Sequence, residues 1–185
     1  MPIFQNIRSC VRRKHEVTRK PTKVHFNVRI GDAFKSENVA SQLRVLLIYI
    51  AREGVAVTDL FRRPGNPRSI KKVIADLEAG RPVCWTNYDF YTLANIAKRF
   101  LLRVDGGILG EAAENALIES LDIPDIDARY ASKTVQQLLA LLFGTWFRMI
   151  YHTEVNAMSV EAVAKSVAGS VFPSCTYSPE RVCCI

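Results

Sequence analysis

Apolar residues recur every three to four positions through most of this chain, and glycine or proline interrupts the pattern between runs. That spacing places the apolar side chains on one face of an α-helix. We expect Ser36 to cap the first helix and Gly54 to end it. Its apolar face consists of Val39, Leu43, Leu46, Leu47 and Ile50. Since the later runs repeat the pattern, the sequence predicts an all-α fold.

Further helices follow from the same spacing, and Ser69 and Asp89 are placed to begin two of them. The run at 131–152 is long and very apolar, so we expect it to be the central buried helix. The ranges after the first helix are 70–78, 88–102, 110–121, 131–152 and 159–171. The prediction is a domain of roughly six or seven helices.

Three segments divide the chain. Residues 1–24 are basic and are expected to form a flexible arm, residues 25–172 the helical domain, and residues 173–185 an irregular tail. Val24–Ile30 alternates loosely between apolar and polar residues, which favours a short extended stretch leading into the domain. Hydrophobic residues make up 49% of the chain, enough for a substantial core.

The positive charge is concentrated in the arm. Of the net charge of +7, residues 1–23 carry +6, and the rest of the chain is close to neutral. Residues 8–23 could therefore contact an anionic membrane, although a solvated tail explains the same pattern. We expect no nucleic-acid binding, because a nucleic-acid-binding fold normally presents a basic face.

Several common sites are absent from the sequence. It contains no Gly-rich phosphate loop, no G-x-S-x-G and no H-E-x-x-H. The five cysteines are odd in number and lack C-x-x-C spacing, so we expect neither a zinc site nor a disulfide framework. Acylation of Cys183 or Cys184 stays open. No stretch resembles a membrane span or a signal peptide, so we expect a cytoplasmic protein, with membrane association through the arm left open.

Arg62 is the most conspicuous candidate functional residue. It follows an apolar run and enters a loop broken by Pro64, Gly65 and Pro67. Such a loop can hold a guanidinium out towards a partner, whereas an isolated arginine in a loop is commonly a solvated charge. Later polar residues could converge with it on one face.

Three blocks in this chain resemble the RhoGAP family, in order and with plausible spacing over about residues 25–172. They are F-R-R-P-G at 61–65 behind Glu53-Gly54-Val55, Y-D-F-Y-T at 88–92 with K-R-F-L at 98–101, and N-A-M at 156–158 with Val163-Ala164. The resemblance implies a RhoGAP-like helical bundle. It also implies a partner, a Rho-family small GTPase in its GTP form.

The resemblance implies roles for individual residues. Arg62 corresponds to the finger arginine that enters the partner's GTP site, and Lys98 to the lysine that supports the finger loop and contacts the partner. Further partner-binding positions would be Arg63, Asn66, Arg103 and Asn156. The chain would need no cofactor, because GTP and Mg²⁺ belong to the GTPase.

Among the places where the chain departs from the family pattern, two are binding positions. Leu102 stands where the family usually has arginine, with Arg103 one residue later, and Ala162 replaces a second asparagine. One residue rotates a helix position by about 100°, so Arg103 cannot simply substitute. We therefore expect weaker or retargeted binding. One alternative is a catalytic activator. Another is a catalytically weak or inactive module that binds GTP-loaded Rho-family GTPases or another signalling partner. The third is an unrelated helical protein whose basic arm binds nucleic acid or membrane.

Overall fold

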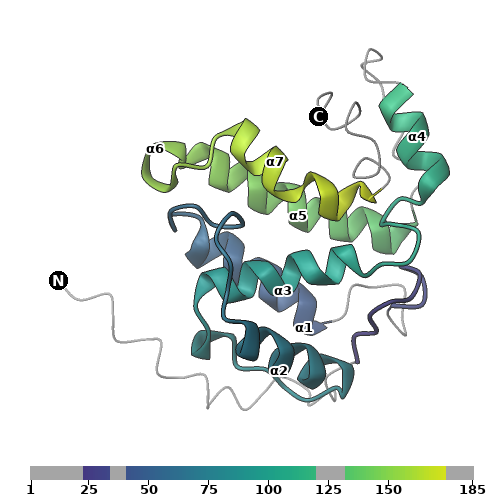
Figure 1. Ribbon diagram of the computed structural model, residues 1–185, viewed down its shortest axis with the longest axis horizontal. Coiled ribbons are helices and arrows are strands. Elements are labelled where there is room, and N and C mark those ends of the chain that lie inside the picture. The colour runs from purple at the N-terminus through teal and green to yellow at the C-terminus, as the bar shows by residue number, and fades with distance from the viewer. Residues whose placement is uncertain (1–22, 34–40, 120–131, 174–185) are drawn as a thin grey trace.

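The computed structural model describes residues 23–33, 41–119 and 132–173 (Figure 1). Within these ranges it is mostly helical, which confirms the predicted all-α class. The helices are α1 (Ser41–Tyr49), α2 (Pro67–Glu78), α3 (Phe90–Leu102), α4 (Glu111–Glu119), α5 (Lys133–Tyr151), α6 (Thr153–Asn156) and α7 (Val160–Val171). A π-helical turn, η2 (Ile50–Gly54), continues α1, and a 3₁₀ turn, η3 (Trp85–Asn87), precedes α3.

Helix α3 lies at the centre of the bundle. It packs against α1, α2 and α7, and it runs between α2 and the α5–α7 pair in Figure 1. Its side chains Leu93, Ile96 and Phe100 are almost fully buried. The predicted central helix, α5, instead covers one side. It buries Leu138, Leu142, Trp146 and Met149 but leaves Phe143, Phe147 and Tyr151 exposed.

Local capping explains where α2 and α3 begin. Asn66 caps α2, since its side-chain oxygen accepts hydrogen bonds from the backbone N–H groups of Arg68 and Ser69. Pro67 supplies the fixed φ that suits the first helical position. The prediction that Ser69 caps this helix was wrong, because Ser69 already lies in its first turn. Asp89 caps α3 by accepting from Thr92 N.

The extended segment predicted at 24–30 is found in part, because Asn27 bends the backbone with φ 58° and Ile30 begins a turn. Val24 and Phe26 are buried, and Val28 forms an isolated parallel bridge with Val104. Val24 N donates to Leu77 O at 3.1 Å, and Asn27 N donates to Arg103 O at 2.8 Å. The segment therefore ties the end of α2 to the end of α3.

Some predictions fall outside the described residues. These are the basic arm with its membrane contact at residues 8–23 (apart from Lys23, which is exposed), the N-cap Ser36, and the tail with Cys183 and Cys184. Within the described ranges, no helix is both long enough and apolar enough to cross a membrane.

Candidate functional site

Residues 55–66, the Arg62 loop, join η2 to α2. The backbone turns sharply within this loop, because Asp59 and Phe61 adopt positive φ angles of 57° and 66°. Such angles are unfavourable for non-glycine residues and persist only when the surroundings hold them. The backbone N–H groups of Arg62 and Arg63 both donate to Asp59 O, at 2.9 and 3.1 Å. The loop is therefore a closed turn built on Asp59.

Burial separates the two halves of this turn. Leu60 and Phe61 are buried in the core, whereas the next two side chains, Arg62 and Arg63, are 54% and 57% exposed. The apolar pair anchors the turn, and burying each such side chain stabilises the fold by about 1.5–3 kcal/mol. Because the chain reverses immediately after Phe61, the arginines extend into solvent, as the sequence predicted for Arg62.

Two side chains of α3 hold the carbonyl groups on either side of Arg62. Lys98 Nζ donates to Phe61 O at 3.2 Å, and Asn95 Nδ2 donates to Arg63 O at 2.9 Å. Asn95 and Lys98 lie about one turn apart on the same face of the helix. Lys98 is half-buried, and this desolvation lowers the pKa of its amine below the usual value. The structure thus places Lys98 beneath the loop as a support.

Asn156 supports the loop from the other side. Its side chain is fully buried; Nδ2 donates to Val55 O at 2.6 Å and Met149 O at 2.8 Å, and Oδ1 accepts from Met158 N at 2.7 Å. Its own backbone oxygen accepts from Asp59 N at 2.9 Å. Direct contact between this side chain and a partner, which the resemblance implied, does not fit that burial. The geometry gives Asn156 an internal role.

The end of the loop lies against the first turn of α3. Asn66 N donates to Thr92 Oγ1 at 2.9 Å, and Thr92 Oγ1 donates in turn to Asp89 Oδ2 at 2.8 Å. Gly65 allows this close approach, since a Cβ atom there would lie only 2.6 Å from Thr92 N. The side chain of Asn66 is used as the helix cap of α2, so this predicted binding residue also has a structural task.

We expect Gly65→Ala to lower the free energy of unfolding by about 1–3 kcal/mol, because the added methyl group meets backbone that cannot easily move. Gly144→Ala is the matched control. It lies inside α5 with open space where the added methyl group would lie, so it should be neutral or stabilising by up to about 1 kcal/mol. Chemical denaturation of both variants measures the difference, and equal stabilities would contradict the close approach.

Both exposed arginines bind one carboxylate. Arg62 Nη1 lies 2.9 Å from Asp59 Oδ1, and Arg63 Nε and Nη2 lie 3.3 and 3.2 Å from Asp59 Oδ2. The guanidinium of Arg63 also lies over the ring of Tyr91, 5.8 Å from its centroid. The sequence reasoning missed Asp59, although its position three residues before Arg62 was a visible signal. Exposed ion pairs of this kind contribute about 0–1 kcal/mol to stability, so Arg62 remains available.

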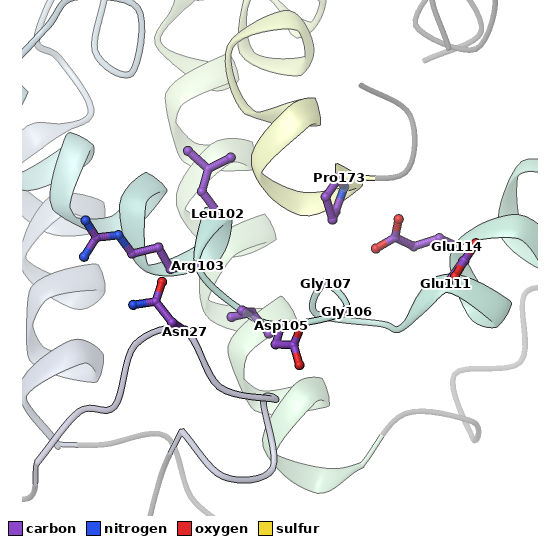
Figure 2. A pocket seen from close by; sticks show the side chains of 10 residues that line it. Asn27, Leu102, Arg103, Asp105, Gly106, Gly107, Glu111, Glu114 and Pro173 are labelled. Atoms are coloured by element: carbon purple, nitrogen blue, oxygen red, sulfur yellow. The ribbon is translucent and has the colours of Figure 1, made fainter. Parts of the chain in front are cut away.

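Arg103 is not brought together with Arg62. It follows the C-terminal end of α3, and its guanidinium lies 5.8 Å from the centroid of the Phe26 ring. Figure 2 shows it on one side of a pocket of about 490 Å³, with Glu111, Glu114 and Pro173 across from it. The Arg62 loop instead packs on the earlier turns of α3. The neighbouring Leu102 is 54% exposed.

Comparisons with known proteins agree with this architecture. Residues 41–176 match the family model described as the RhoGAP domain. The chain is 22% identical over 167 residues to Rho GTPase-activating protein 20 of Homo sapiens, which covers 84% of this chain and 14% of that protein. The chain thus spans about one seventh of that relative's length. Human Rho GTPase activating protein 15 has a similar crystal structure, with a TM-score of 0.74, 12% identity and coverage of 88% and 85% of the two chains.

Proposed function

We propose that this chain, which belongs to the RhoGAP domain family, accelerates GTP hydrolysis on a Rho-family small GTPase and uses Arg62 as its finger. One observation carries the proposal. Lys98 and Asn95 hold the carbonyl groups that flank Arg62, while the arginine side chain itself is exposed and only weakly paired. A fixed backbone with an available guanidinium is the arrangement that insertion into another protein's active site requires.

The chemistry follows from the guanidinium. The γ-phosphoryl group passes through a transition state that spreads negative charge over its oxygens. An arginine is always protonated and offers several N–H donors in one plane, so it can bind these oxygens as charge develops. The GTPase supplies GTP, Mg²⁺ and the residue that orients the attacking water. Arg62 contributes charge stabilisation, which for a finger amounts to about 10³–10⁵ in rate.

Support from within the domain would make the insertion efficient. The Arg62 loop is held at Val55, Asp59, Phe61 and Arg63 before any partner arrives. A loop that is already ordered loses less conformational entropy on binding. Lys98 and Asn156 therefore act beneath the surface. Arg63 and Asn66 border Arg62 on the face offered to the partner, and Arg103 would contact it only at a separate place.

A second candidate is a module that binds the GTP-loaded GTPase without accelerating hydrolysis. Leu102, which is 54% exposed, and the partly buried Ala162 favour it, because neither can make the polar contact that the family residue at its position would make. Lost polar contacts at an interface each cost about 1–3 kcal/mol. Weak binding would reduce the rate at low concentration even with a functional finger, so the two candidates separate at saturating protein.

The test is single-turnover GTP hydrolysis by a panel of Rho, Rac and related GTPases, with increasing amounts of this protein. We expect at least one member to hydrolyse GTP about 10³-fold faster or more at saturation, as a supplied arginine finger would allow. If a folded protein accelerates none of them, the activator role is wrong. Binding to GTP-loaded but not GDP-loaded GTPases would then support the second candidate.

A further inference from the structure

Asp59 binds both exposed arginines of the Arg62 loop through its side chain. Its backbone is held at both ends, since its N–H donates to Asn156 O and its carbonyl accepts from Arg62 N and Arg63 N. The carboxylate is therefore fixed in position, with 21% of the side chain exposed. One oxygen binds Arg62 and the other binds Arg63. A single negative charge is shared by two positive ones.

The two arginines are held unequally. Arg62 makes a single hydrogen bond to the carboxylate, through Nη1. Arg63 makes two, through Nε and Nη2, and its guanidinium also lies over the ring of Tyr91. The Tyr91 hydroxyl donates to Thr58 O at 3.0 Å, which fixes that ring against the same loop. Arg62 is therefore the arginine that can more easily break its bond to Asp59, and Arg63 is the one that stays bound to it.

When Arg62 leaves the Asp59 carboxylate, the negative charge of that carboxylate affects the finger. To reach the phosphate oxygens, Arg62 must give up its bond to Asp59, and the carboxylate then lies close to an anionic transition state. An unneutralised carboxylate would attract Arg62 back and repel the phosphoryl group. With Arg63 still bound, the pair of Asp59 and Arg63 is neutral overall, and both effects are weakened.

We propose that Asp59 holds Arg62 in the free protein and that Arg63 is a positioning residue, the counter-ion that keeps Asp59 neutralised when Arg62 moves to the phosphate. This inference rests on the proposed function and adds a regulatory step to it. Arg63 thus acts through Asp59 and does not need to touch the GTPase. An arginine with direct partner contact would behave differently when Asp59 is changed.

A double-mutant cycle tests the inference by single-turnover hydrolysis at saturating protein, on the GTPase that wild type accelerates best. Arg63→Ala should reduce the maximal rate about threefold to fivefold, in line with one exposed charge pair. Asp59→Asn should match or exceed wild type, and asparagine tolerates the positive φ at this position. Asp59→Asn with Arg63→Ala should recover to within about twofold of Asp59→Asn alone, because the charge to be neutralised is gone.

Arg81→Ala is the control for removal of an exposed paired arginine. Arg81 lies 2.7 Å from Asp76, just beyond α2, and should not affect the rate. If the double variant stays as slow as Arg63→Ala, Arg63 contacts the partner directly and the inference is wrong. A lower maximal rate for Asp59→Asn alone would also overturn the inference, because the Asp59 carboxylate would then be required for activity instead of restraining Arg62.

A measurement on the free protein does not depend on GTPase activity. NMR can follow the rotation rate of the Arg62 guanidinium in wild type and variants. We expect slower rotation in Arg63→Ala, where Arg62 is the remaining partner of Asp59, and faster rotation in Asp59→Asn. Equal rates in all three proteins would overturn the restraint by Asp59. Absence of acceleration by wild type, with these differences present, would refute the proposed function alone.

Discussion

Replacing Arg62 with alanine is expected to abolish nearly all acceleration of GTP hydrolysis, a loss of about 10³-fold or more at saturating protein. The variant removes the guanidinium and leaves the loop backbone in place, because Lys98 and Asn95 bond to the carbonyl groups of Phe61 and Arg63. The lost ion pair with Asp59 is exposed, so stability should change by no more than about 1 kcal/mol. Single-turnover kinetics and thermal unfolding measure the two effects.

Binding should largely survive this change, since the finger interaction develops mainly in the transition state. Arg62→Lys should fall between wild type and Arg62→Ala, because it keeps the charge but loses the planar fork of donors. Arg81→Ala, which breaks another exposed ion pair, should keep full activity. If Arg62→Ala accelerates hydrolysis as well as wild type, Arg62 is not the finger.

The exposure of Arg62 could be predicted from local sequence. An apolar residue directly before two arginines, followed by proline and glycine, is enough to anticipate a buried Phe61 and a solvent-facing turn. The fold class followed in the same way from the spacing of apolar residues. Both features depend on neighbours along the chain, which is the information that one sequence carries most directly.

The supports of the loop could not be predicted, because they come from distant parts of the chain. Asn156 reaches Val55, which is 101 residues earlier, and Thr92 reaches Asn66 across 26 residues. No local pattern distinguishes a fully buried asparagine from an exposed one. The resemblance identified the position of Asn156 but implied a contact with the partner rather than an internal bond.

The order of burial among the helices also required the structure. Apolar content made 131–152 look central, but α5 carries Phe143, Phe147 and Tyr151 on an exposed face. Helix α3 is shorter, with 13 residues against 19 in α5, yet it packs against α1, α2 and α7. The burial of a helix depends on how many other helices pack against it. That number follows from the three-dimensional arrangement of the helices and cannot be read from the apolar content of one segment.

The residues that hold the Arg62 loop are different from the residues at which the chain departs from its family. The supports of Arg62 are internal, so they do not depend on Leu102 or Ala162, where the chain departs from its family. Loss of contacts at those two positions should affect affinity for the GTPase more than the maximal rate. An activator that binds weakly but reaches a high maximal rate at saturation is therefore the outcome that we expect under the proposed function.

Asn156→Asp is expected to lower the free energy of unfolding by about 3 kcal/mol or more, because the change places an acceptor against the carbonyl groups of Val55 and Met149 in a fully buried site. The melting temperature should fall by about 6–12 °C for a domain of this size. Val55 and Asp59 both form hydrogen bonds with Asn156, so the Arg62 loop should shift as well. A displacement of about 1 Å can reduce catalysis about 10²-fold.

Asn95→Asp makes the same chemical change in a partly exposed place. Asn95 Nδ2 also donates to two carbonyl groups, those of Arg63 and Tyr91, but water can replace its bonds. We expect a loss of stability of about 1 kcal/mol or less, with a smaller loss of activity. Thermal unfolding and single-turnover hydrolysis compare the two variants directly. Equal losses of stability would mean that the burial of Asn156 does not determine how strongly it holds the loop.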